Sequence, residues 1–108
     1  MAWEILYYSD WLQEEILAMP VTLQARYLHL TARMRIFGAD LGLPHTRAMG
    51  DGLFELRLKG AEGIARVFYC TLVGKKIVML HHFIKKSEKT PKRELVVAIR
   101  RMQEVKAC

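Results

Sequence analysis

Residues 53–86 read LFELRLKGAEGIARVFYCTLVGKKIVMLHHFIKK, and this stretch decides the fold. It contains three runs rich in β-branched and aromatic residues, separated by the short segments KGAEG and VGK. Connections this short, with glycine where a positive φ is needed, join neighbouring antiparallel strands as hairpins. The stretch therefore predicts a three-stranded antiparallel meander with strands at LFELRL, IARVFYCTL and KKIVMLHHFIKK.

Side chains along each predicted strand alternate between the two faces of the sheet. In the first run, apolar and ionic residues alternate. The apolar residues are Phe54, Leu56 and Leu58, and the ionic residues are Glu55, Arg57 and Lys59. The third run divides into His81, Phe83 and Lys85 on one parity and His82, Ile84 and Lys86 on the other. Arg66 begins a run that is otherwise apolar, and a buried arginine needs a carboxylate, a ligand or water as its partner. Side by side, the strands are expected to gather Glu55, Arg57, Lys59, Arg66, His81, Lys85 and Lys86 on the open face and its edge.

The residues before the meander predict a strand and two helices. WEILYY predicts a strand at about residues 2–8, and Ser9 and Asp10 are good N-cap residues for a short helix that Pro20 interrupts. The next segment, VTLQARYLHLTARMRIFG, predicts a helix that ends at Gly38. Its apolar stripe consists of Leu23, Tyr27, Leu30, Met34 and Phe37. The two helices are expected to form a hairpin that covers an apolar surface.

The remaining segments complete the expected fold. Residues 39–52, ADLGLPHTRAMGDG, are rich in glycine and breakers and predict a loop that ends in the turn pair Asp51-Gly52. Pro91 opens PKRELVVAIRRMQEV, which predicts a helix with one apolar side. The order is strand, two-helix hairpin, three-stranded antiparallel meander and C-terminal helix. It predicts one α+β domain over residues 1–108, with the helices packed on one face of the sheet.

The charge of the chain is concentrated in its C-terminal half. Of the formal charge of +6, residues 51–108 contribute 13 basic against six acidic residues, and residues 1–50 four against five. An asymmetry of this kind favours an anionic partner such as nucleic acid or an acidic protein. The alternative is a surface whose charge only keeps the protein in solution.

The sequence carries no signal for a membrane or a metal. No window reaches the roughly 18 uninterrupted apolar residues that a membrane span needs, and the N-terminus lacks the pattern of a signal peptide. Cys70 and Cys108 lack metal-ligand spacing and are expected to be free thiols. We therefore expect a cytoplasmic protein without membrane contact, metal or cofactor.

The cationic set has the composition of an RNA site. Arginines bind phosphates in bidentate fashion, lysines act as point charges, and an aromatic ring such as Phe83 stacks on an unpaired base. Cleavage of an RNA backbone needs a nucleophilic 2′-oxygen, a stabilised pentavalent phosphate and a proton for the departing 5′-oxygen. Cations serve the phosphate, and His81, His82 or a lysine are the candidates for proton transfer.

Each of these residues also has a structural interpretation. The lysines at 75, 76, 85, 86, 89 and 92 are equally consistent with a solvated sheet edge that discourages aggregation. His81 and His82 fit one core and one surface histidine, and Arg57 has Glu55 and Glu62 as alternative partners. Composition and periodicity alone predict a small basic α+β domain and leave its activity open.

Three motifs in order carry a more specific resemblance. They are FELR at 54–57, G-x-A-R-V-F-Y at 63–69 and VMLHHFIKKSEKTPKREL at 78–95. The sequence resembles the RelE/HigB superfamily of type II toxins, in particular the phage-derived HigB-like branch, over nearly its whole length. That branch typically shows an E-L-R strand with an aromatic residue, an arginine opening the next strand, and the ending L-x-x-F-x-K-K-x-x-K-T-P.

The resemblance implies a ribonuclease that enters the ribosomal A site, contacts ribosomal RNA and cleaves the mRNA there without a metal. It implies that Arg57 and Arg66 hold and polarise the phosphate and that Lys85 and Lys86 add charge or acid catalysis. Phe83, Lys59 and Lys89 are expected to bind RNA. The implied partner is a helix-turn-helix antitoxin of the HigA type.

The sequence also departs from the superfamily. Some members use a tyrosine near the C-terminus as a catalytic group, whereas PKRELVVAIRRMQEVKAC contains none. That role is empty or passes to His81, His82 or a lysine. The main alternative function is that of a ParE-like toxin, which shares the fold but inhibits gyrase without nuclease activity. A second alternative is an inactive member whose basic face only binds an acidic antitoxin.

Overall fold

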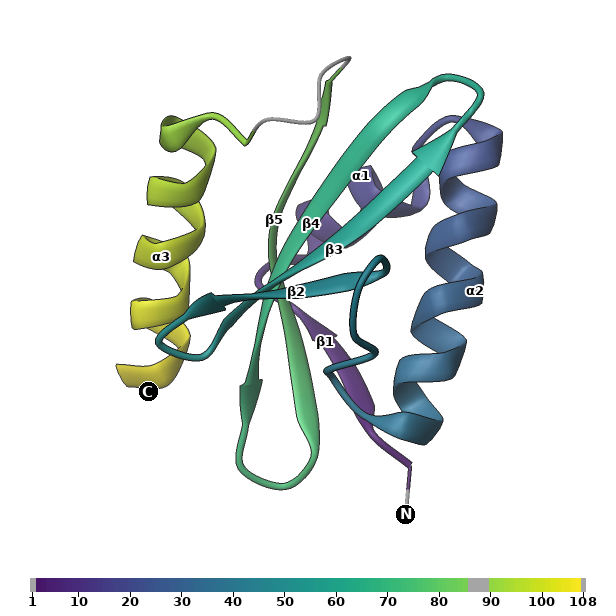
Figure 1. Ribbon diagram of the computed structural model, residues 1–108. Coiled ribbons are helices and arrows are strands. Elements are labelled where there is room, and N and C mark those ends of the chain that lie inside the picture. The colour runs from purple at the N-terminus through teal and green to yellow at the C-terminus, as the bar shows by residue number, and fades with distance from the viewer. Residues whose placement is uncertain (1, 86–89, 108) are drawn as a thin grey trace.

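The computed structural model describes residues 2–85 and 90–107 and contains a five-stranded sheet flanked by helices (Figure 1). The elements are β1 (Glu4–Tyr7), α1 (Asp10–Leu17), α2 (Val21–Phe37), β2 (Thr46–Gly50), β3 (Leu53–Gly60), β4 (Gly63–Leu72), β5 (Lys76–Lys85) and α3 (Lys92–Ala107). The strand order is β1-β5-β4-β3-β2, with β1 parallel to β5 and the other pairs antiparallel. The α+β class, the helix hairpin, the meander and the C-terminal helix are confirmed.

The ends of the first two helices follow the signals in the sequence. The side chain of Ser9 accepts a hydrogen bond from the backbone N–H of Leu12 at 3.2 Å and caps α1. Gly38 ends α2 with a φ of +97°, and its N–H donates to the carbonyl oxygen of Met34 at 2.8 Å. A positive φ at this position favours glycine over residues with a Cβ.

One residue of the predicted stripe on α2 does not join the core. Phe37 is 69% exposed, whereas the buried residues of α2 are Leu23, Tyr27, Leu30, Thr31 and Met34. Phe37 is the last residue of the helix, and Trp3 packs against the core at this end with its ring beside Gly38. The prediction that Phe37 is a core residue was therefore wrong, because a residue from the N-terminal segment fills that place.

The segment predicted as a loop contains an additional strand. Residues 46–50 form β2, which pairs with β3 and places Arg47 opposite Glu55. The pair Asp51-Gly52 makes the expected turn, with φ values of 56° and 86°, and this turn joins β2 to β3 as a hairpin. The sequence TRAMG has little strand propensity and no alternation, so backbone pairing with β3 decides its conformation.

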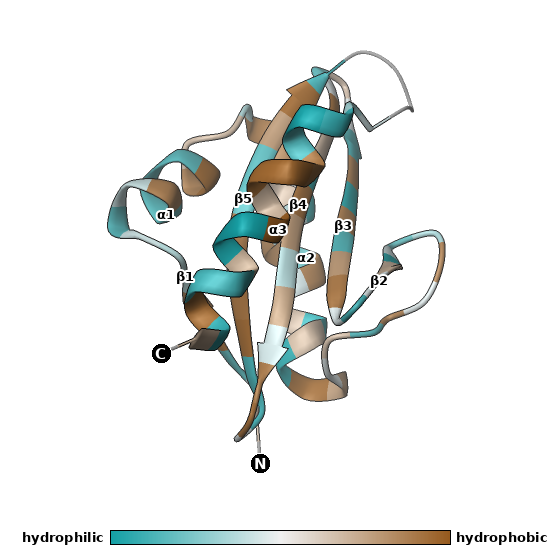
Figure 2. Cartoon of the chain, turned by 90° about the vertical axis from the view of Figure 1, so that its left-hand side faces the viewer, coloured by the Kyte–Doolittle hydropathy of each residue, from teal (hydrophilic) through white to brown (hydrophobic). Residues whose placement is uncertain are grey.

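The helices cover both faces of the sheet, which corrects the prediction of a single covered face. α1 and α2 lie on one side of the strands and α3 on the other (Figure 1). The central strand explains the arrangement, because Val67 and Tyr69 contribute to the core under α1 and α2, while Phe68 and Cys70 contribute to the core under α3. A strand buried on both faces reads as a continuous apolar run, as β4 does. In Figure 2, α3 lies in front of the strands and shows hydrophobic and hydrophilic bands along its length.

In the part of the chain that the structure describes, no helix has both the length and the apolar character that a membrane span requires.

Candidate active site

The strand register places most of the predicted cations on the face that α3 also occupies. Residues directly opposite each other in antiparallel strands project to the same side of the sheet. Two adjacent rows cross β3, β4 and β5 in this way, and they are Arg57–Arg66–Phe83 and Lys59–Ile64–Lys85. The alternation in the sequence thus translates into a cationic patch at the end of the meander, beyond the apolar core that α3 covers.

A cavity of about 350 Å³ opens at this end of the sheet. It is lined by Arg26, Pro44, His45, Arg57, Lys59 and Arg66. Three of these residues come from the meander, Arg26 from α2, and Pro44 and His45 from the segment before β2. The described lining therefore combines four permanent or near-permanent cations with one imidazole, a composition suited to a phosphate group.

Arg66 is held inside the protein by a carboxylate. Its side chain is 1% exposed, that of Glu55 is 2% exposed, and Arg66 Nε lies 3.6 Å from Glu55 Oε1. Arg57 Nε lies 3.8 Å from the same oxygen, and the hydroxyl of Thr90 donates to Glu55 Oε2 at 2.8 Å. One carboxylate thereby orients two of the three arginines of the cavity, Arg57 and Arg66, and Thr90 fixes the carboxylate.

The burial of this cluster points to function. Removing two charges from water costs several kcal/mol per ion, and a buried pair contributes little to stability compared with apolar residues of the same volume. Both arginines of this cluster also line the cavity. Glu55 is therefore positioned to hold Arg57 and Arg66 at the cavity.

Phe83 and Lys85 lie next to the cavity residues without lining the cavity itself. Phe83 is the cross-strand neighbour of Arg66, and its half-buried ring lies 5.8 Å from the ring of Phe68. Lys85 Nζ lies 5.8 Å from the centroid of the Phe83 ring. The two residues thus extend the cationic face along β5, as the alternation predicted.

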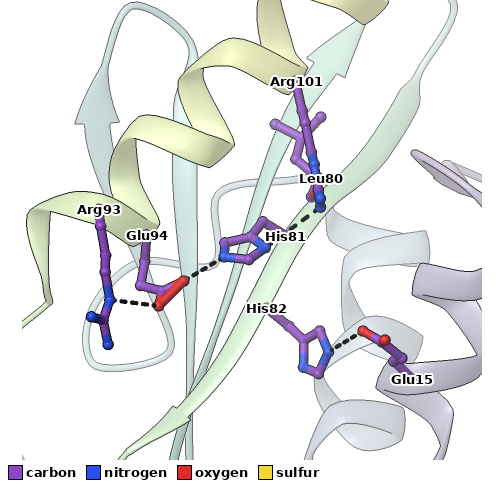
Figure 3. Close-up of polar contacts among 7 residues, drawn as sticks. All are labelled: Glu15, Leu80, His81, His82, Arg93, Glu94 and Arg101. Atoms are coloured by element: carbon purple, nitrogen blue, oxygen red, sulfur yellow. Dashed lines mark hydrogen bonds and ion pairs between the residues drawn. The ribbon is translucent and has the colours of Figure 1, made fainter.

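His81 connects β5 to the C-terminal helix (Figure 3). Its Nε2 donates to the carboxylate of Glu94 at 2.7 Å, and its Nδ1 lies 3.5 Å from Arg101 Nη1. Arg101 also donates to the carbonyl oxygen of Leu80 at 2.9 Å. Both ring nitrogens of His81 therefore face side chains of α3, and neither faces the cavity.

His82 projects to the opposite face of the sheet (Figure 3). It pairs with Val67, whose side chain belongs to the core under α1 and α2, and its Nε2 donates to Glu15 of α1 at 3.1 Å. The two adjacent histidines thus serve two different helices. The remaining predicted site residues, Lys86 and Lys89, lie outside the described residues.

Two residues of the cavity were not predicted from the sequence. Arg26 lies on α2, and His45 lies in the segment that was predicted to be a featureless loop. Arg26 lies on a helix well before the meander, and His45 directly precedes β2, so the packing of α2 and the pairing of β2 with β3 bring them to Arg57. No spacing in the sequence signals this proximity.

The comparison with known protein families assigns the chain. Residues 14–103 match the family described as phage derived protein Gp49-like (DUF891), and the chain belongs to this family. It is a RelE/HigB-like toxin family, associated with toxin-antitoxin systems, whose members are often endoribonucleases and whose toxins have an antitoxin partner. No curated protein matches the sequence.

Proposed function

We propose that the protein is the toxin of a type II system and that it cleaves mRNA in the ribosomal A site, which stops translation. The observation that carries this proposal is the cavity of about 350 Å³ in which three arginines, a lysine and a histidine converge. Such a cavity fits one phosphodiester of a single RNA strand. Cations fill the role that metal ions have in many nucleases, so the proposed cleavage is metal-independent.

The proposed reaction is an internal transfer of the phosphate. The 2′-oxygen attacks the neighbouring phosphorus, the bond to the 5′-oxygen breaks, and the products carry a 2′,3′-cyclic phosphate or 3′-phosphate and a 5′-hydroxyl. Arg57 and Arg66 stabilise the additional negative charge of the pentavalent transition state. Glu55 holds their guanidinium groups in place, 3.8 Å and 3.6 Å from one of its oxygens, before substrate binds.

The other cations bind the flanking RNA. Lys59 and Arg26 line the same cavity and contact the phosphate or its neighbours. Lys85 extends the positive surface, and Phe83 shapes the base pocket. RNA contacts of Lys86 and Lys89 stay predictions from the sequence, because both lie outside the described residues. A catalytic contribution of His81 or His82 stays a prediction, and it would require each histidine to leave its carboxylate partner.

The proposed partners follow from this activity. The substrate is mRNA, ribosomal RNA contacts the basic surface, and the protein acts in the cytoplasm. We propose that the antitoxin is a helix-turn-helix protein of the HigA type. Binding through several cations predicts that affinity for ribosomes falls steeply with salt and that replacing Lys85 and Lys86 together flattens this dependence. Affinity that does not change with salt would contradict the electrostatic account.

Primer extension on a defined mRNA in a reconstituted translation reaction tests the proposal. The wild-type protein is expected to produce cuts that require ribosomes, and Arg66→Ala is expected to abolish them. Arg100→Ala, which removes an exposed arginine of α3 outside the cavity, is the matched control and should cut like the wild type. Normal translation without cuts would reject the nuclease, and a supercoiling assay would then test gyrase inhibition.

A further inference from the structure

The proposed cleavage needs a group that accepts the proton of the 2′-hydroxyl, and the cations of the cavity do not have one. A guanidinium group offers donors only, and a lysine ammonium has no acceptor atom either. Arg26, Arg57, Lys59 and Arg66 therefore hold the phosphate but do not activate the nucleophile in their charged forms. The acceptor must come from another side chain at the cavity.

The histidines singled out in the sequence are engaged elsewhere. His81 directs Nε2 to Glu94 and Nδ1 to Arg101, and His82 lies on the opposite face of the sheet beside Glu15. Glu55 is close to the arginines, but it is buried, and its two oxygens face Arg57, Arg66 and Thr90. None of these three groups is among the residues that line the cavity.

His45 is at the cavity and has the required chemistry. Among the side-chain types of the described lining, imidazole is the one that is ordinarily neutral near pH 7 and then carries an acceptor nitrogen. Its backbone carbonyl accepts from the N–H of Arg57 at 2.8 Å, so it lies directly across the strand edge from that arginine. The residue is half-buried and lines the cavity.

The backbone around His45 is fixed by a compact set of hydrogen bonds. The N–H of Gly42 donates to Asp40 Oδ1 at 3.0 Å, and the hydroxyl of the buried Thr46 donates to the same oxygen at 3.3 Å. The N–H groups of His45 and Thr46 both donate to the carbonyl oxygen of Gly42, at 3.1 Å and 3.0 Å. His45 therefore approaches the cavity from a defined turn, and precise placement of this kind is what proton transfer requires.

We infer that His45 is the general base of this site, an inference that rests on the proposed nuclease function. A neutral ring nitrogen of His45 takes the proton of the 2′-hydroxyl as the 2′-oxygen forms its bond to phosphorus. The bond to the 5′-oxygen breaks, and the departing oxygen takes a proton from solvent water. The imidazolium then returns its proton to water, which balances the cycle.

The test is the single-turnover cleavage rate of His45→Gln on ribosome-bound mRNA, measured across about pH 5.5 to 8.5. We expect a loss of about 100-fold or more, because general base catalysis contributes at least that factor. The wild-type rate should fall toward acidic pH as the base becomes protonated, and the variant should lose this decline. Ribosome binding should be unchanged. His29→Gln, an exposed histidine of α2, is the matched control and should retain the wild-type rate and profile.

Two further measurements separate the possible outcomes. Free imidazole should restore part of the activity of His45→Ala, which a misfolded variant would not show. An mRNA whose 5′-bridging oxygen at the cut site is replaced by sulfur has a leaving group that needs no proton. If this substrate restores full activity to His45→Gln, His45 is the acid and the inference is overturned. Equal rates for His45→Gln and the wild type would reject the inference alone, whereas an inactive wild type would reject the nuclease function and the inference with it.

Discussion

The same strands form both faces of the sheet, but the two faces differ in the side chains they carry at one end of the strands. The face under α1 and α2 is apolar over most of its length, and its fully buried residues include Leu56, Leu58, Ala65 and Met79. A polar exception is His82, which lies beside Glu15 of α1. The face under α3 is apolar only where the helix covers it, around Phe68 and Leu80, and becomes cationic beyond that point. One face therefore packs the core, whereas the other is divided between an apolar part under α3 and the cationic part to which we assign the proposed chemistry.

The boundary on the α3 face coincides with three cross-strand rows. The row Glu55–Phe68–His81 ends the part connected to α3, and the rows that begin with Arg57 and Lys59 carry the cations. Glu55 and His81 belong to this boundary row. The carboxylate of Glu55 contacts Arg66 of the cavity, whereas the imidazole of His81 contacts Glu94 of α3. Substitutions on either side of this row should therefore separate stability from activity.

The largest effect is expected for Arg66→Ala. The change leaves the buried carboxylate of Glu55 without its closest arginine, so we expect a loss of about 3 to 5 kcal/mol in the free energy of unfolding, together with loss of cleavage. The double variant Glu55→Gln/Arg66→Met removes both charges and should recover most of the stability but none of the activity. Urea unfolding and primer extension measure the two quantities. Recovery of cleavage in the double variant would contradict the role of Arg66.

Leu58→Ala tests the face under α1 and α2. Leu58 is fully buried, and its truncation should lower the free energy of unfolding by about 2 to 5 kcal/mol. Cleavage per folded molecule should be unchanged at a temperature where the variant remains folded. Leu28→Ala, at an exposed position of α2, is the matched control and should change stability by less than about 0.5 kcal/mol. A loss of cleavage per folded molecule in Leu58→Ala would contradict the claim that this face contributes to stability only.

Arg57→Ala tests the cationic part of the α3 face. The Arg57 side chain is 27% exposed, so its removal should cost less than about 1 kcal/mol of stability. Cleavage should fall by about 100-fold or more, as is typical when a donor to a transition-state oxyanion is removed. Thermal unfolding and single-turnover rates provide the measurement. A large loss of stability with normal cleavage would mean that Arg57 stabilises the fold and does not take part in cleavage.

The smallest effect is expected for Arg101→Ala, which loosens α3. Its guanidinium group lies 4.8 Å from the Tyr8 ring and 5.1 Å from the Trp11 ring, and it bonds the carbonyl of Leu80. Together these contacts should contribute about 1 to 2 kcal/mol. Chemical denaturation should detect this loss, and hydrogen exchange should show it first in α3. An unchanged exchange pattern would mean that α3 is held by its apolar contacts alone.

Local patterns predicted the meander and its cations well, because strand alternation is a property of neighbouring residues. Arg57, Arg66, Phe83 and Lys85 share one face in the structure as their parity required. The sequence analysis missed His45, because its place at the cavity depends on the pairing of β2, a strand with weak propensity. The pairing of β2 with β3 decides the position of His45, and residues 46–50 carry no alternation that would signal this pairing.

The fates of His81 and His82 show the same limit. Their alternation correctly predicts opposite faces, but what each face holds depends on α1 and α3. Because all helices were predicted to cover one face, His81 was expected on an uncovered face of the sheet. Because α3 covers that part of the sheet, His81 meets Glu94 instead of a cavity.

The chemistry at the RNA ends tests the central claim most directly. Wild-type protein is added to translating ribosomes, the cut mRNA is isolated, and its termini are identified by enzymatic end-labelling before and after phosphatase treatment. A cationic cavity that promotes attack by the 2′-oxygen predicts a 2′,3′-cyclic phosphate or 3′-phosphate and a 5′-hydroxyl. A 3′-hydroxyl with a 5′-phosphate would contradict the account, because that product requires water to attack the phosphorus in place of the 2′-oxygen.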